Sequence, residues 1–249
     1  MRRGRGELDR WFRSAARRIP AARRLRAAIS PTARREALDG ERLRFLLAVV
    51  LAPDSNCIDV GSHVGGVLQE MVRLAPAGRH IAYEPLPELC SRLRARFPEV
   101  DVREVALSNR SGESTFVHVR NQPGLSGLRR RSYPREPEFE ELTVRLESLD
   151  ASLPDGYEPS LIKIDVEGAE REVIEGAIET IVRCKPVVVF EHGKGAAPHY
   201  GTGPRDVYGL LAEHAGMRIF DLDGNGPFEL TDFQRAFERG ERWNFVAHA

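Results

Sequence analysis

The residues with the greatest capacity for chemistry lie in one short run, from Lys163 to Glu170. Since side chains alternate along a strand, Lys163 and Asp165 share one face of the strand that ends here. Ligands of open α/β sheets bind at the carboxyl ends of strands, where Asp165 and Glu167 fall. Asp165 is therefore a candidate catalytic residue. The alternative is that these acids only stabilise the positive end of the helix expected at 169–182.

A glycine-containing turn follows an earlier apolar strand, with Asp59 two residues before Gly61 and Gly65 four residues after it. Glycine lets the backbone turn sharply and approach a ligand closely, and a helix N-terminus behind the turn has free N–H groups. The spacing differs from the GxGxxG of diphosphate sites. Asp59 would repel a diphosphate but attract, directly or through water, the ammonium of a methionine moiety. The turn therefore suits a cationic ligand, such as S-adenosylmethionine, better than a phosphate.

Glu84 ends the next apolar strand, 23 residues after Gly61. A carboxylate there can accept hydrogen bonds from both hydroxyls of a ribose. The same spacing occurs in nicotinamide-binding folds, so it does not separate the two cofactors. Leu107 and Ser108 follow the third strand, and we expect them to border the adenine.

His192 is a second catalytic candidate because it follows the fifth strand, where a histidine can act as a general base. An ordinary loop histidine is the alternative. A helix N-terminus lowers the pKa of a carboxylate, which would make Asp165 a weaker base. Asp165 can instead orient the acceptor hydroxyl or hold a divalent ion with Glu167, although we predict no metal site.

Short apolar runs alternate with helical patterns, which predicts a doubly wound, mostly parallel α/β sheet. The expected strands are 56–60, 79–83, 100–106, 161–165, 186–191, 217–221 and 243–248. The expected helices are 32–51, 65–75, 86–96, 169–182 and 204–215.

The stretch 108–150 differs in character, because two further strands, 113–119 and 142–146, flank a loop at 121–137 that is rich in Gly, Pro, Arg and Ser. A loop of this length is usually functional or mobile, and we expect its part around 123–131 to form a lid over the acceptor. Its arginines 129–131 can bind a phosphate or carboxylate of the acceptor; a solvated loop is the alternative.

Charge is unevenly distributed in a chain whose 37 basic and 37 acidic residues cancel. Neutrality argues against a nucleic-acid partner. Residues 1–26 hold ten Arg and two acids, a formal +8, and an apolar stripe from Leu8 to Ile19 predicts an amphipathic helix. This helix either packs on its own domain or makes weak contact with a membrane surface. Three dispersed cysteines and the lack of a leader or an apolar span lead us to expect a cytoplasmic protein of unknown oligomeric state.

Taken in order, four motifs resemble the FkbM family of S-adenosylmethionine-dependent methyltransferases, over about 56–192. They are Ile58-Asp59-Val60-Gly61, Tyr83-Glu84-Pro85, Ala106-Leu107-Ser108-Asn109 and Ile162-Lys163-Ile164-Asp165-Val166-Glu167-Gly168-Ala169-Glu170. The resemblance implies a seven-stranded class I (Rossmann-like) methyltransferase fold with an antiparallel last strand. Because Pro53 and Asp54 end the helix expected at 32–51, we divide the chain into a basic helical extension at 1–53 and a methyltransferase domain at 54–249.

The resemblance also implies methyl transfer to a hydroxyl of a small-molecule or glycan acceptor, such as a sugar, glycolipid or secondary metabolite. It places Asp59, Gly61 and Gly65 in the first cofactor motif and Glu84 at the ribose. One departure is that the family usually has Ala-Asn where this chain has Ser62-His63.

Two other classes of protein remain open. A nicotinamide-dependent oxidoreductase would use the same Gly61 to Glu84 spacing, but GxGxxG and a Tyr-x-x-x-Lys pair are lacking. A non-catalytic binding module would keep the fold and the cofactor without turnover.

Overall fold

The computed structural model describes residues 30–134 and 136–249. It separates a compact unit ending at Leu46 from a second unit, Leu47–Ala249. Helix α3 (Pro31–Val50) corresponds to the helix expected at 32–51. The Arg-rich arm at 1–26 lies outside the described residues, so its helix and its membrane contact stay predictions. The division of the chain into an extension ending at residue 53 and a domain beginning at residue 54 also stays a prediction.

A seven-stranded sheet, in the order β3-β2-β1-β7-β8-β10-β9, forms the centre of the second unit. The five strands from β3 to β8 are parallel, and β10 is antiparallel to both of its neighbours. This confirms the predicted seven-stranded, mostly parallel sheet. The bounds are β1 (Cys57–Val60), β2 (Ile81–Tyr83), β3 (Asp101–Arg103), β7 (Leu161–Ile164), β8 (Val187–Glu191), β9 (Arg218–Asp221) and β10 (Asn244–His248).

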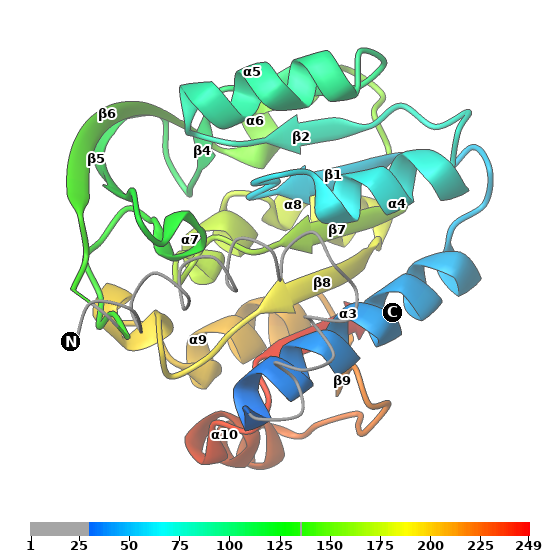
Figure 1. Cartoon of the computed structure of the whole chain (residues 1–249). Helices are drawn as coiled ribbons and strands as arrows, with labels where there is room; N and C mark the ends of the chain where they lie inside the picture. The colour runs from blue at the N-terminus through cyan, green and yellow to red at the C-terminus, as the bar shows by residue number, and fades with distance from the viewer. Residues whose placement is uncertain (1–29, 135) are drawn as a thin grey trace. The chain divides into compact units, whose positions relative to one another are not determined.

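Helices cover both faces of this sheet (Figure 1). They are α4 (Gly66–Leu74), α5 (Pro87–Arg96), α6 (Leu149–Ser152), α7 (Glu170–Glu175), α8 (Ile178–Cys184), α9 (Pro204–Tyr208) and α10 (Leu230–Arg239), with short 3-10 turns η1 (Pro123–Leu125) and η2 (Ala197–Tyr200) and a π-helical turn η3 (Gly209–His214). Within the described ranges, no helix is both long and apolar enough to cross a bilayer.

The helix expected at 169–182 is instead two helices, α7 and α8, which are separated at Gly176. A Cβ at Gly176 would lie 2.1 Å from the carbonyl oxygen of Ser108, so the main chains come too close there for any side chain. The expected helix at 204–215 continues from α9 into η3. Helix α10 was not predicted; its buried Phe233 and Phe237 pack it onto the core.

A smaller sheet, ordered β4-β6-β5, contains the two further strands expected from the sequence. Its strands are β4 (Ala106–Leu107), β5 (Gly112–Val119) and β6 (Phe139–Glu147), so the strand expected at 100–106 is divided between β3 and β4. Figure 1 shows the β5–β6 hairpin on the side toward which the parallel strands point. The residues that follow β5 fold back on it, because Val117 and Gly127 exchange two backbone hydrogen bonds of 2.8 and 3.1 Å.

Candidate active site

Four residues lie at the carboxyl ends of neighbouring parallel strands, and we call them the tip row: Gly61, Glu84 and Asp165, which directly follow β1, β2 and β7, and Glu191, the last residue of β8. The strand register fixes them, because Val60 pairs with both Tyr83 and Ile164, and Ile164 pairs with Phe190. The order of the strands reverses between β1 and β7, which is where open α/β sheets bind ligands. Three of the four residues carry carboxylates, so the site is acidic.

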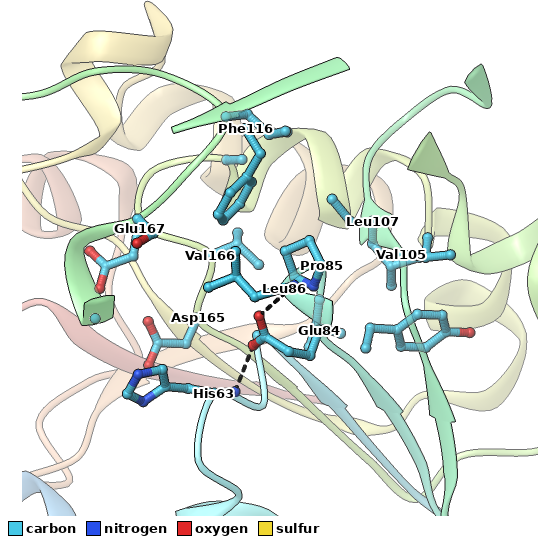
Figure 2. A pocket seen from close by; sticks show the side chains of 18 of the residues that line it. His63, Glu84, Pro85, Leu86, Val105, Leu107, Phe116, Asp165, Val166 and Glu167 are labelled. Carbon is cyan, nitrogen blue, oxygen red and sulfur yellow. Dashed lines mark hydrogen bonds between the residues drawn. The ribbon is translucent and has the colours of Figure 1, made fainter. Parts of the chain in front are cut away.

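A cavity of about 180 Å³ lies over the tip row (Figure 2). One wall comes from the strand ends, and includes Gly61, Glu84 and Asp165. The opposite wall comes from the β5–β6 hairpin, through Phe116 of β5 and residues of 120–131, which we call the lid segment. The predicted lid therefore lies against the strand ends.

One end of the cavity is apolar. Figure 2 shows the side chains that line this end: Leu86, Val105, Leu107 and Phe116. Such a surface suits the flat face of an adenine ring. Ser108 does not line the cavity, and the residue is only 5% exposed.

Gly61 and Glu84 lie at the centre of the cavity wall, and both make close contacts with neighbouring main chain. Gly61 has φ 77°, and a Cβ on it would lie 1.9 Å from the carbonyl oxygen of Asp165. The Glu84 carboxylate accepts the backbone N–H groups of His63 (2.8 Å) and Leu86 (3.0 Å), one on each oxygen. Burial raises the pKa of Glu84 to about 7, although these two hydrogen bonds oppose the shift. Each oxygen keeps a further lone pair for a ligand hydroxyl.

Asp59 and Gly65 of the predicted cofactor motif lie behind the cavity wall. Asp59 is 1% exposed, and burial raises its pKa although the charge of Lys163 opposes this. Gly65 precedes α4 and packs beside Leu93 and Phe97 of α5. Both residues shape the turn from behind; neither lines the cavity.

Asp165 is bound to Lys163, as their positions on one strand face predict. The Nζ of Lys163 lies 2.7 Å from Oδ2 of Asp165. Burial acts to raise the pKa of Asp165, but the ammonium of Lys163 outweighs it and the pKa lies below its usual value. Glu191 also faces this carboxylate and hydrogen-bonds to it, and burial, followed by the charge of Asp165, raises the pKa of Glu191.

Glu167 joins the strand ends to the lid segment. Its backbone has φ 59°, a conformation that is uncommon without glycine, and its Oε2 lies 2.7 Å from Nη2 of Arg131. Burial and the neighbouring Asp165 raise the pKa of Glu167 to about 8. Arg131 is therefore engaged by a carboxylate, and Arg130 likewise pairs with Glu141 at 2.7 Å. The described part of the chain contains no group of three or more His, Cys, Asp or Glu side chains arranged to hold a metal.

His192 lies away from the cavity. Its side chain is fully buried, and its ring packs on Phe233 and Phe237 of α10 with centroid distances of 6.1 and 5.1 Å. Burial lowers its pKa to about 4. These surroundings give His192 a packing role without access to an acceptor, so we leave it out of the proposed mechanism.

His63 also lines the cavity, and in the sequence it is distinguished only as a departure from the family pattern. It lines the wall beside Glu84, and Figure 2 shows its imidazole pointing toward the carboxylate of Asp165. Its backbone has φ 48°. Spacing alone gave no signal for this orientation, because it depends on a left-handed turn packed between two strands.

The residues of the site fit S-adenosylmethionine. The cavity combines an apolar end for adenine, a carboxylate at Glu84 with capacity for ribose hydroxyls, and further carboxylates toward which a sulfonium is attracted. A diphosphate would meet the same acids and be repelled, which disfavours a nicotinamide dinucleotide.

Comparison with known proteins agrees with this fit. Residues 59–219 match the family described as the methyltransferase FkbM domain. The 2-O-methyltransferase NoeI of Sinorhizobium fredii is 29% identical over 159 residues, which cover 57% of this chain and 65% of NoeI. The AMB antimetabolite synthetase AmbE of Pseudomonas aeruginosa is 26% identical over 185 residues, 59% of this chain and 9% of AmbE. The chain thus spans less than two thirds of either relative.

A solved structure shares the fold. The methyltransferase FkbM of Methylobacillus flagellatus KT has a TM-score of 0.51 and 14% identity, over 80% of this chain and 44% of that one. Because the family match covers well over half of the 249 residues, the chain belongs to the FkbM methyltransferases and takes S-adenosylmethionine as its cofactor.

Proposed function

We propose that the protein transfers a methyl group from S-adenosylmethionine to a hydroxyl of a small-molecule or glycan acceptor. The observation that carries this proposal is the Lys163–Asp165 pair at the end of β7, whose Asp165 lines a cavity with an apolar end suited to a nucleoside. The similarity to NoeI, a protein named as a 2-O-methyltransferase, supports an oxygen acceptor.

The cofactor supplies an electrophilic methyl group, so the protein has to align, desolvate and deprotonate the acceptor. In this proposal Glu84 binds the ribose hydroxyls and Leu107 borders the adenine. Gly61 allows the close approach of the cofactor to the backbone. Asp165 lies at the acceptor side, where its charge, maintained by Lys163, orients the acceptor and favours a proton leaving it.

The test is incubation of the purified protein with S-adenosylmethionine carrying an isotopically labelled methyl group and a panel of sugars, glycolipids and hydroxylated metabolites. Mass spectrometry should find the label in a methyl ether. A product labelled only on nitrogen or carbon would overturn the choice of oxygen. Binding of S-adenosylhomocysteine without any labelled product across the panel would favour the non-catalytic module.

A further inference from the structure

A general base is needed because the pKa of an alcohol lies far above neutrality. Asp165 is poorly suited, since its Oδ2 is already engaged by Lys163 and its pKa is held below the usual value despite burial. His192 is packed into the core. Glu84 is assigned to the ribose, and Glu167 is paired with Arg131 of the lid segment. This leaves His63 as the side chain of the cavity lining that can receive the proton.

The backbone around His63 is fixed on three sides. Its N–H donates to Glu84, the adjacent Ser62 N–H donates to the carbonyl of Tyr83 at 3.2 Å, and Arg96 donates to the carbonyl of Val64 at 3.0 Å. These bonds hold a non-glycine residue at φ 48°, a conformation that projects its side chain toward the end of β7. Strained backbone of this kind persists where the surroundings determine it, and it is concentrated at active sites.

The imidazole and the carboxylate of Asp165 interact electrostatically, since the charge of His63 is one of the influences that lower the pKa of Asp165. Asp165 is held in turn by Lys163. The other charged groups around the imidazole are Glu84, which follows β2, and Glu167, which lies beyond β7; both line the same cavity. The surroundings are therefore acidic and favour an imidazole that takes up a proton.

We propose that His63 is the base that receives the proton of the acceptor hydroxyl, and that Asp165 is a positioning residue that orients its imidazole. This inference rests on the proposed O-methylation. The hydroxyl proton moves to a ring nitrogen while the oxygen lone pair forms the bond to the methyl carbon. The electron pair of the broken carbon–sulfur bond stays on sulfur, which becomes a neutral thioether. The imidazolium lies beside Asp165 until it releases its proton to water.

The first test is His63→Asn. Asparagine tolerates a left-handed backbone, so the turn should survive the loss of the imidazole. We expect turnover to fall about 10²–10⁴-fold while calorimetric affinity for S-adenosylhomocysteine changes less than about threefold. His199→Ala removes an exposed histidine outside the cavity and serves as the matched control. Unchanged turnover in His63→Asn, or an equal loss of cofactor affinity, would overturn the assignment.

The second test needs no acceptor. The imidazole resonance of His63 is assigned by its disappearance in His63→Asn, and its titration is followed by NMR. Asp165→Asn should move the midpoint of this titration to lower pH, because a neutral amide no longer stabilises the imidazolium. An unchanged midpoint overturns the proposal even if an O-methyl product forms. Conversely, a shifted midpoint in a protein that methylates no hydroxyl would show that O-methylation itself is the mistaken step.

Discussion

The ammonium of Lys163 lies 2.7 Å from Oδ2 of Asp165, although the lysine is only 8% exposed and stands within the parallel sheet. A buried cation of this kind is costly unless a partner compensates it. The pair thus fixes the charge of the strand end at which we place the acceptor.

Lys163→Met should lower the free energy of unfolding by about 1–3 kcal/mol at pH 8, less than for a fully buried pair because about a third of the Asp165 side chain is exposed. Lys163 holds the pKa of Asp165 down, so its stabilisation exists above the unfolded pKa and is lost as pH falls through the folded one. The difference in unfolding free energy between the variant and the unmodified protein should therefore persist down to about pH 4 and narrow only at lower pH, at about pH 3. Urea unfolding across this pH range measures it, and a difference independent of pH would contradict the pairing.

Glu84→Gln should weaken S-adenosylhomocysteine binding by about 1.5–3 kcal/mol, because a charged acceptor of the ribose hydroxyls is lost. The pKa of Glu84, raised by burial to about 7, also predicts that affinity of the unmodified protein falls as pH decreases from 8 to 6. The variant should show a flatter profile in calorimetry. Glu88→Gln, an exposed position on α5, is the control. Equal affinities of the two variants would remove Glu84 from the ribose site.

Gly61→Ala should abolish cofactor binding and destabilise the domain, since its Cβ meets the Asp165 carbonyl and its φ is unfavourable for alanine. Gly66→Ala is the matched control, because a Cβ there meets nothing within 4 Å. That control should be neutral or up to about 1 kcal/mol more stable. Thermal melting with and without S-adenosylhomocysteine distinguishes the two variants. Similar melting curves would show that the close approach of Gly61 to the Asp165 carbonyl is unimportant.

Arg131→Met should release the lid segment from Glu167, because it removes a pair whose side chains are 9% and 19% exposed. We expect amide hydrogen exchange in 120–131 to accelerate about tenfold or more, since a charge-assisted hydrogen bond contributes about 1.5–3 kcal/mol. Arg130→Met breaks an exposed pair with Glu141 and should change little. Equal exchange in both variants would mean that Arg131 does not hold the lid.

The sheet and the strand ends that line one wall of the cavity could be predicted because parallel strands bring their carboxyl ends to one edge. Glu84 and Asp165 could thus be assigned to a common edge before any contact was known. Gly176 could not be recognised as a break, because its close approach to Ser108 joins segments distant in the chain. The lid segment was recognised by composition, but not the pairing of Arg131 with Glu167.

His192 shows a limit of the strand-end rule. Neighbouring side chains alternate along a strand. The side chains of His192 and Phe190 therefore lie on the side of the sheet covered by α10, whereas Glu191 faces Asp165. Proximity to a strand end therefore did not decide which side of the sheet the ring would face. The orientation of His63 could not be predicted because its positive φ directs the side chain toward the cavity, which the regular alternation of a strand would not do.

The tip row also fixes the distance between the ribose site at Glu84 and the acceptor site at Asp165. Strands in a sheet are roughly 4.8 Å apart, and β1 separates β2 from β7, so Glu84 and Asp165 stand about 10 Å apart along the row. Backbone hydrogen bonding determines this interval, and the hairpin plays no part in it. Exchanging the hairpin should therefore change which acceptors are admitted while the span from the ribose to the reacting oxygen stays constant.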